Sequence, residues 1–509
     1  MNIFLTIDVG TTSIKIVAFD TEFNILEIII KEYKLLTPKP SIVELDSEIY
    51  WDSTKKGITE VIQKLSGKNM GKINVSAISL CSQGETIILL DKEGKEVRRS
   101  INWLDNRSVS ESKAIDEHFG VDKVYDITGQ QEIVPTWPAT KLLWLKNNER
   151  ASYNRINKIL LTKDFIVYKL TGKFETELSV SSSTLYCDIN AKCWWNEMIN
   201  YIGYNTDQFP ILREPGEIVE TISAKTAIEL EINRDCLIIN GAFDQASSML
   251  GSGNITSGIL TETTGAVLAI GATLDNPTRD PKKRIACYYH AIPDKYYFLP
   301  WESTAGMALK WFRDEFCYFE KMHAKSSGQD VYEIMDEEIS DVPAGSEGLI
   351  FLPYLCGSCT PEFNANAKAV FYGIQLGHTR KHFIRAVMES IGYKIRDNLS
   401  VLKELNIEFD EIRSLGGGSK SRIWRQIKSD INSLKILKLK SAESTSFGAA
   451  MMAAKALGIY GSYEYISKNY IKIDETVEPQ KENIEIYNNS YNLFLQVYKN
   501  LLGTFETNI

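Results

Sequence analysis

The stretch ILTETTGAV (residues 259–267) places adjacent threonines and a glycine between two apolar segments. A second stretch, FLTIDVGTTSIKIVAFD (residues 4–20), has the same form. Both are typical of two strands joined by a tight turn, because apolar residues and Thr favour strands and Gly permits the turn. Such a turn exposes backbone N–H groups that can bind an anion, and Thr hydroxyls add donors. For either turn alone, an ordinary hairpin is the alternative.

Strands and helices alternate around both hairpins. We expect a strand at residues 25–33, a helix capped near Asp46 and a strand at residues 75–80. A similar series begins near Leu237, enters a short helix after Asp244 and reaches the second hairpin. This order predicts an α/β fold built twice from mixed sheets. The restart of the pattern predicts domains at residues 1–252 and 253–509, the second ending in a helical tail.

Length and composition narrow the class of protein. The chain has 509 residues, an ordinary globular composition and a net charge of −9. The acidic balance argues against nucleic-acid or anionic-membrane partners. Eight scattered cysteines fit a reducing cytoplasm, and we interpret Cys356 and Cys359 as loop thiols, with a zinc site as the alternative. The apolar run at residues 3–7 lacks a basic leader and is expected to be neither signal peptide nor membrane span.

Two further features indicate nucleotide chemistry. Asp8 ends an apolar strand directly before the first turn, where Mg²⁺ held by one or two carboxylates and substrate phosphates would suit it. Alternatively, Asp8 accepts hydrogen bonds from the turn itself. The stretch GGGSKS (residues 416–421) is not a Walker motif, because Ser419 precedes Lys420 where glycine is required. Three glycines before a helix still allow a nucleotide to lie against the backbone.

Taken in order along the chain, ten short motifs resemble those of the FGGY carbohydrate kinases, which share a duplicated actin-like, ribonuclease-H-like fold. The resemblance implies two such domains with a cleft between them, in which both hairpins hold the phosphates of ATP. The motifs are IDVGTTSIK, NWLDNR, LLTKDFIVYKLTG, NGAFDQASSMLGSG, TETTGAV, STAGMALKW, FLPYL, AVFYGIQLGHTRKHFIRAVMESIGY, LGGGSKSRIWRQIKSDI and SFGAAMMAAKALG.

The resemblance also implies roles for individual residues. Asp244 would accept the proton of the sugar hydroxyl, although its position also suits a helix N-cap. The segments CSQGET (residues 81–86) and NWLDNR (residues 102–107) would bind the sugar, with an aromatic face from Trp103. Instead of binding the sugar, Asp105 and Arg107 could form a structural ion pair with each other. The implied sugar-binding residues are Gln83, Glu85, Trp103, Asp105, Arg107 and Gln245.

For ATP and Mg²⁺ the resemblance implies a second set of residues. Asp8 and Asp244 would hold Mg²⁺ through water. Gly306 has helix packing as its alternative, and Thr263 stands where the family usually has glycine. The implied ATP-binding residues are Thr11, Thr12, Lys15, Thr264, Gly265, Gly306, Gly417, Gly418 and Ser421.

The expected function is an ATP-dependent kinase of a small sugar, a ketopentose such as xylulose. Xylulokinases usually carry Met-His after Gln83, whereas this chain has Gly84 and Glu85, closer to the Arg-Glu-Thr of glycerol kinases. The stretch IVPTWPATKLLWL (residues 133–145) favours xylulokinases. Alternatives are a glycerol- or erythritol-type polyol kinase, a deoxyketose kinase, a nucleotide-switch ATPase of the same fold and an inactive sugar sensor. Because dimers are common in the family, the resemblance also suggests a homodimer, but no residues point to an interface.

Overall fold

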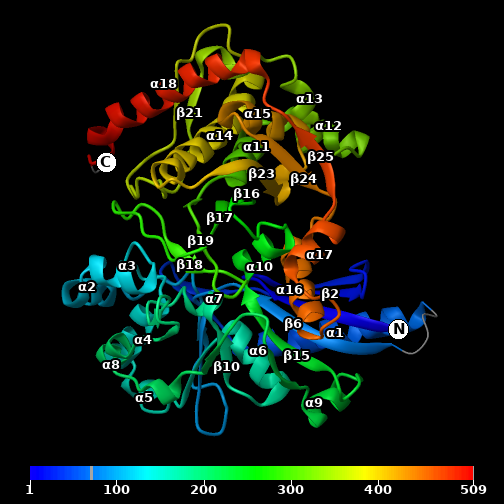
Figure 1. Ribbon diagram of the computed structural model, residues 1–509. Coiled ribbons are helices and arrows are strands. Elements are labelled where there is room, and N and C mark those ends of the chain that lie inside the picture. The colour runs from blue at the N-terminus through cyan, green and yellow to red at the C-terminus, as the bar shows by residue number, and fades with distance from the viewer. Residues whose placement is uncertain (69–72, 508–509) are drawn as a thin grey trace. The chain divides into compact units, whose positions relative to one another are not determined.

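The computed structural model describes residues 1–68 and 73–507, which form two compact units (Figure 1). The first unit comprises residues Met1–Ile255, Leu274–Tyr297 and Glu443–Ile471, and the second comprises Thr256–Thr273, Phe298–Ala442 and Lys472–Ile509. Each unit combines strands with helices, so the predicted α/β fold is confirmed. The segments Leu274–Tyr297 and Glu443–Ile471 thus belong to the first unit although they come later in the sequence. The predicted domain boundary between residues 252 and 253 stays a prediction.

A six-stranded mixed sheet forms the centre of the first unit. Strands β1, β6 and β15 run parallel, whereas β2 and β3 continue from β1 as antiparallel neighbours. Nearly every side chain of β1 is buried, as expected for a strand covered on both faces. The order is β14 (Ile218–Thr221), β15 (Leu237–Phe243), β6 (Asn74–Ser82), β1 (Asn2–Val9), β2 (Ser13–Asp20) and β3 (Ile25–Glu32).

Helices of the first unit pack on this sheet. The Asp46 carboxylate accepts from the N–H of Glu48 at 3.0 Å and caps α1 (Ser47–Gly67), as predicted. Helix α16 (Ser444–Ala456) packs on α10 (Asp244–Gly251) and on β1, β6 and β15. The other helices are α2 (Val109–Phe119), α3 (Val121–Thr128), α4 (Pro138–Asn148), α5 (Arg150–Tyr153), α6 (Thr162–Thr171), α7 (Leu178–Ser181), α8 (Asn196–Ile202), α9 (Ala224–Glu229) and α17 (Tyr463–Tyr470), with the 3-10 helix η1 (Thr206–Gln208).

A second sheet of the first unit carries the predicted sugar segments. Residues 83–86 connect β6 to β7, and residues 102–107 follow β8. Its order is β4 (Leu36–Lys39), β5 (Ile42–Leu45), β8 (Ser100–Ile101), β7 (Ile87–Leu90) and β9 (Lys158–Leu161). The shorter strands are β10 (Glu175–Glu177), β11 (Cys187–Asp188), β12 (Cys193–Trp194), β13 (Ile211–Arg213), β18 (Cys287–Tyr289) and β19 (Tyr296–Phe298).

The sheet of the second unit repeats the topology of the first. Strands β16 and β17 form an antiparallel hairpin, as β1 and β2 do, and β16 runs parallel to β23, as β1 does to β6. This repetition agrees with the predicted duplication. The order is β17 (Leu268–Leu274), β16 (Gly258–Thr264), β23 (Phe409–Leu415), β24 (Lys435–Leu439) and β25 (Ile473–Val477), with β20 (Trp301–Glu302) beside β17.

Long helices dominate the rest of the second unit. Helix α14 (Arg380–Glu404) is one of them, and the C-terminal helix α18 (Lys481–Phe505) packs against α15 (Arg422–Asn432) and β21 (Figure 1). The other elements are α11 (Gly306–Phe316), α12 (Tyr318–Ser327), α13 (Val331–Glu338), β21 (Ile350–Leu352), β22 (Val370–Tyr372), η2 (Ala344–Gly348) and η3 (Gly417–Ser419).

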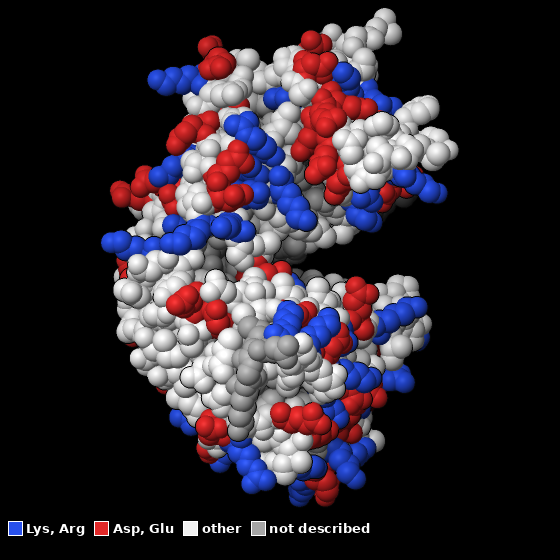
Figure 2. Space-filling view, turned by 90° about the vertical axis from the view of Figure 1, so that its right-hand side faces the viewer, with Lys and Arg blue, Asp and Glu red and all other residues white. Residues whose placement is uncertain are grey.

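The remaining features of the fold are the surface charges, the cysteines and the apolar character of the helices. Lys and Arg side chains lie close to Asp and Glu side chains over much of the face in Figure 2. All eight cysteines are free thiols, with Cys356 exposed and Cys359 buried. Across residues 1–68 and 73–507, no helix has the length and apolar character needed to span a membrane.

Candidate active site

Three parallel strands end at one edge of the first unit's sheet. Asp8 of β1 pairs with Cys81 of β6, which pairs in turn with Ala242 of β15. The segment 83–86 directly follows the end of β6, and Asp244 directly follows the end of β15. Asp8, this segment and Asp244 therefore lie at the same edge of the sheet. Ligands of α/β proteins usually bind at the carboxyl ends of parallel strands.

Asp8 lies beside a lysine that is already paired. Lys15 faces Asp8 across the hairpin, and its Nζ donates to Glu443 at 2.7 Å. Burial raises the pKa of Asp8 to about 6, Glu443 adds to this rise and Lys15 opposes it. The N–H of Gly10 donates to the carbonyl of Ser13 at 2.9 Å, so this N–H closes the turn instead of binding Asp8. A cation would be stabilised beside this carboxylate.

The Asp244 carboxylate does not cap its helix. Phe243 occupies the N-cap position without a side-chain bond, and Asp244 is the first residue of α10. Its Oδ1 is buried and has no partner among the described residues. Burial raises the pKa of Asp244 well above its ordinary value, and the charges of Asp8 and Glu85 raise it further. This carboxylate is therefore a strong acceptor for a proton, a hydroxyl donor or a cation.

Glu85 and Lys141 form a second pair of perturbed charges. Glu85 has φ 55°, a left-handed conformation that is uncommon for a residue other than glycine. Burial raises its pKa to about 7, with Lys141 opposing the rise. Burial lowers the pKa of Lys141 to about 7, and the charges of Asp105 and Glu85 oppose that fall. A strained acidic residue in a predicted substrate segment is typical of a functional site.

Gly84, one of the two residues that depart from the xylulokinase pattern, is closely packed by its neighbours. A Cβ at this position would lie 2.7 Å from Ser183 Oγ and 3.1 Å from a ring carbon of Phe243. A side chain at position 84 therefore requires Ser183 to move.

A chain of hydrogen bonds joins the first turn to the sugar segments. Trp103 Nε1 donates to Thr11 Oγ1 at 3.0 Å, and Thr11 Oγ1 donates to Gln83 Oε1 at 3.1 Å. Gln83 Nε2 is buried and has no partner among the described residues. Thr12 is exposed. The hydroxyl of Thr11 thus orients Trp103 and Gln83, whereas contacts of Thr11 and Thr12 with phosphate stay predictions.

Asp105 and Arg107 form the ion pair that was the structural alternative. Asp105 is fully buried, and its carboxylate accepts from Arg107 Nε at 2.8 Å and Nη2 at 2.7 Å. Arg107 Nη2 also donates to Glu44 at 2.6 Å. The N–H of Val43 adds a bond to Asp105 at 2.7 Å. This network supports the substrate segment, and direct contact of Asp105 with a sugar stays a prediction.

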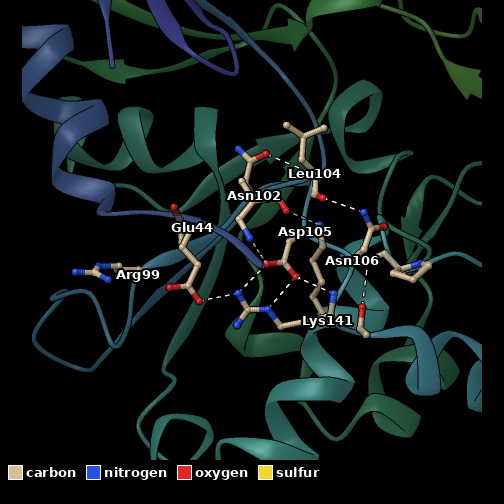
Figure 3. A network of polar contacts seen from close by, with 12 residues as sticks. Glu44, Arg99, Asn102, Leu104, Asp105, Asn106 and Lys141 are labelled. Carbon is tan, nitrogen blue, oxygen red and sulfur yellow. Dashed lines mark hydrogen bonds and ion pairs between the residues drawn. The ribbon is translucent and has the colours of Figure 1, made fainter. Parts of the chain in front are cut away.

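Lys141 belongs to the same network. Its Nζ donates to the carbonyl of Asn102 at 2.9 Å. In the view of Figure 3, Asp105 lies between Glu44 and Lys141. Lys141 thus joins helix α4 to the segment that carries Trp103.

The turn of the second unit is packed by glycines. A Cβ on Gly306 would lie 2.3 Å from the carbonyl of Gly265, and the Gly306 N–H donates to that carbonyl at 2.9 Å. A Cβ on Gly418 would lie 2.7 Å from the Cβ of Thr264. Both glycines therefore have the packing role foreseen as the alternative for Gly306.

The glycine-rich turn offers bare backbone at one position. A Cβ on Gly417 would meet nothing within 4 Å. Ser421 caps α15, because its Oγ accepts from the N–H of Trp424 at 3.0 Å. Contact of Gly417 or Ser421 with a nucleoside stays a prediction.

Several charged residues near these segments were not expected from the sequence. Glu443 and Lys141 are far in sequence from the segments that they support, whereas Glu262 and Lys428 lie within quoted motifs but their buried partners do not follow from the motif. Thr264 is buried, and its hydroxyl binds Glu262 and Lys428. Buried charges become recognisable only after the chain is folded, so spacing offered no signal for them. Gln245 is partly exposed beside Asp244, and its contact with a sugar stays a prediction.

The charged side chains alone do not make a metal centre. Among the described residues, no group of three or more His, Cys, Asp or Glu side chains is suited to hold a metal ion. Asp8 and Asp244 supply two interacting carboxylates. This donor set fits a hydrated Mg²⁺ that takes its remaining ligands from water and substrate phosphates.

The two α/β units, each with a hairpin that continues into a mixed sheet, place the fold in the actin and sugar-kinase class. Family models described as "FGGY family of carbohydrate kinases", N-terminal and C-terminal domain, match residues 3–251 and 263–457 respectively. The chain belongs to the FGGY family of carbohydrate kinases. It is accordingly a sugar kinase, a phosphotransferase with an alcohol group as acceptor.

Individual relatives carry two sugar names. A xylulose kinase from Staphylococcus epidermidis is 31% identical over 504 residues, covering 98% of this chain and 96% of the relative. A gluconokinase from Bacillus subtilis is 30% identical over 465 residues, covering 91% and 89%. A ligand-bound xylulose kinase from Lactobacillus acidophilus has a TM-score of 0.91 at 26% identity, covering 99% of each chain.

Proposed function

We propose that this sugar kinase transfers the γ-phosphate of ATP, with Mg²⁺, to a hydroxyl of a ketopentose such as xylulose. The observation that carries the proposal is the Asp244 carboxylate at the start of α10, whose Oδ1 is buried and has no partner among the described residues. Phosphoryl transfer needs aligned reactants, neutralised charge and an acceptor for the hydroxyl proton.

Asp244 would accept the proton of the attacking hydroxyl. Burial raises the pKa of Asp244 well above its ordinary value, so its carboxylate has a higher affinity for the hydroxyl proton than an exposed Asp has. Asp8 would hold Mg²⁺ through water, together with Asp244 and the phosphates. Mg²⁺ would supply neutralisation of the phosphate charge.

The sugar would bind the segments around Glu85 and Trp103. The ring of Trp103 offers an apolar face, and its indole nitrogen is already bound to Thr11. The Glu85 carboxylate can accept bonds from two adjacent hydroxyls. Gln83 Nε2, which lacks a partner in the described chain, is a further donor for a sugar oxygen.

Charge favours a neutral sugar over an aldonate such as gluconate. Asp8, Glu85 and Asp244 are close enough for their charges to interact. An additional carboxylate on the substrate would be repelled unless Lys141 compensated it, and Lys141 is fully buried. Xylulose kinase relatives therefore support the proposal more strongly than the gluconokinase relative, and neutral polyols are the second candidates.

The test measures ADP release from MgATP with xylulose, ribulose, deoxyxylulose, erythritol, glycerol and gluconate, and without any acceptor. We expect the highest kcat/KM with a ketopentose, and a loss of kcat of about 10²–10⁴-fold in Asp244→Asn. Asp235→Asn is the matched control, because Asp235 is an exposed carboxylate just before the other end of β15.

Two results would contradict the proposal. Acceptor-independent ATP hydrolysis at the same rate would favour the nucleotide-switch ATPase. A preference for gluconate would show that the three carboxylates do not exclude an acidic sugar.

A further inference from the structure

A buried cluster of charged and hydroxyl side chains lies directly behind the turn of the second unit. Glu262 and Thr264 belong to β16, Ser414 to β23 and Lys428 to α15. None of the four side chains is more than 1% exposed. All four belong to the second unit, so the cluster is complete within it.

The cluster is fully connected around Thr264. Lys428 Nζ donates to Glu262 Oε1 at 2.9 Å and to Thr264 Oγ1 at 2.7 Å. Thr264 Oγ1 donates to Glu262 Oε1, and Ser414 Oγ donates to Glu262 Oε2 at 2.8 Å. Glu262 and Ser414 are also partners in the parallel pairing of β16 and β23.

Chemistry fixes the direction of these bonds. An ammonium can only donate hydrogen bonds and an ionised carboxylate can only accept them. The Thr264 hydroxyl must then accept from Lys428 and donate its only proton to Glu262. It has no proton left for a phosphate oxygen, so the sequence expectation of a free Thr264 donor does not hold in this arrangement.

Thr264 also determines how the glycine-rich turn packs. Gly418 approaches Thr264 so closely that a Cβ would lie 2.7 Å from the Thr264 Cβ. A Cβ on Gly416 would lie 2.9 Å from the Thr264 carbonyl. Helix α15 follows this turn and carries Lys428, so one cluster connects both predicted nucleotide segments.

We propose that Lys428 and Glu262 are positioning residues for the phosphate turn at residues 264–265. Lys428 and Glu262 lock the Thr264 side chain, and the Lys428 ammonium supplies positive potential behind the turn. The N–H of Gly265 donates to the carbonyl of Val267 at 3.0 Å and closes the turn. Phosphates then bind the exposed backbone of the turn beyond Gly265 and experience this potential, without a bond from the Thr264 hydroxyl. The inference rests on the proposed function in one respect, that this turn binds the phosphates of a nucleotide.

The proposal predicts opposite effects for the two members of the pair. Lys428→Met removes the cation and leaves a buried Glu262 carboxylate near the phosphates, which should repel them. Glu262→Gln keeps the cation and removes the opposing charge, so phosphates should bind as well or better. A purely structural pair would instead weaken binding in both variants.

The experiment is calorimetric titration of the full chain with MgADP and, separately, with adenosine. The ratio of the two affinities isolates the contribution of the phosphates. We expect Lys428→Met to reduce this ratio at least tenfold, Glu262→Gln to maintain or increase it, and the double variant to restore it toward the wild-type value. Lys435→Met is the control, because Lys435 is a partly exposed lysine of the same unit whose ion pair is with Glu411 and not with the cluster.

The outcomes separate this inference from the proposed function. An equal loss of MgADP and adenosine affinity in Lys428→Met, or no change in the ratio, overturns the positioning role alone. If Lys428→Met does not fold, a reduced ratio in Glu262→Gln overturns it. Wild-type protein that binds MgADP no more tightly than adenosine overturns both the inference and the proposed nucleotide site.

Discussion

At the scale of single residues, three half-buried acidic side chains, Asp8, Glu85 and Asp244, interact at one edge of the first unit's sheet. An acid whose pKa is higher in the folded state holds its proton at pH values where the unfolded chain has released it. The folded state then binds more protons, so the free energy of unfolding decreases as the pH rises above about 4. Asp244, Asp8 and Glu85 all contribute in this direction.

We therefore expect Asp244→Asn to stabilise the ligand-free protein while it abolishes catalysis. The stabilisation should be near zero at pH 4 and reach at least about 1 kcal/mol at pH 8, because an uncompensated buried charge is removed. Urea unfolding of both proteins at several pH values measures this difference. A constant difference across the pH range would mean that the Asp244 carboxylate is compensated in the folded chain.

Glu85 provides a second test at the same scale, because its backbone conformation is uncommon for its residue type. Asn adopts the left-handed region more readily than Glu. We expect Glu85→Asn to retain or slightly raise the melting temperature, yet to increase KM for the sugar at least tenfold with little change in KM for ATP. Steady-state kinetics and thermal unfolding measure both. An unchanged sugar KM would remove Glu85 from the substrate site.

Individual site residues were predictable where a family motif surrounds them. The resemblance pointed to Asp8, Asp244 and Glu85, whose perturbed pKa values agree with functional roles. The residues that were missed, among them Lys141 and Lys428, act through buried contacts between elements far apart in sequence. Their residue types are ordinary on a surface, so only folding reveals their environment.

At the scale of elements, helix α10 depends on an unusually close approach to α16. A Cβ on Gly448 would lie 2.0 Å from the carbonyl of Ser247, and one on Gly251 would lie 1.9 Å from the carbonyl of Ser444. Backbone atoms cannot yield as a flexible side chain does. The two helices would have to separate, and Asp244 at the start of α10 would move with them.

We expect Gly448→Ala to destabilise the protein by at least about 1–3 kcal/mol and to lower kcat more than KM for either substrate. Gly503→Ala is the matched control, since Gly503 lies within α18 and a Cβ there would meet nothing within 4 Å. The control should gain about 0.5–1 kcal/mol. Wild-type kcat in Gly448→Ala would mean that the helix contact does not position Asp244.

Elements themselves were the most predictable part of the fold. Both hairpins, the Asp46 cap of α1 and the long helix α14 follow from local patterns of apolar residues and capping side chains. The placement of α16 did not, because α16 directly follows β24 of the second unit in sequence, whereas its contacts are with α10 and β1 of the first unit. Local patterns carry no information about which sheet a later helix packs on.

At the scale of the whole molecule, the predicted sugar and nucleotide residues divide between the two compact units. The sugar segments and Asp244 belong to the first unit, whereas Thr264 and the glycine-rich turn belong to the second. Within the first unit, the predicted contacts with phosphate are confined to the first hairpin, at Thr11, Thr12 and Lys15. Each ligand should therefore stabilise its own unit, because binding to the folded state opposes local opening.

Hydrogen exchange followed by mass spectrometry tests this division. At saturation, xylulose alone should slow exchange at residues 83–86 and 102–107. MgADP alone should slow residues 262–268 and 416–428, with residues 10–13 as the only first-unit segment that responds. We expect at least tenfold slowing where occupancy exceeds about 90%, since RT ln(1 + [L]/Kd) then exceeds 1.4 kcal/mol. Protection of residues 416–428 by xylulose alone would contradict the assignment, because no predicted sugar contact belongs to the second unit.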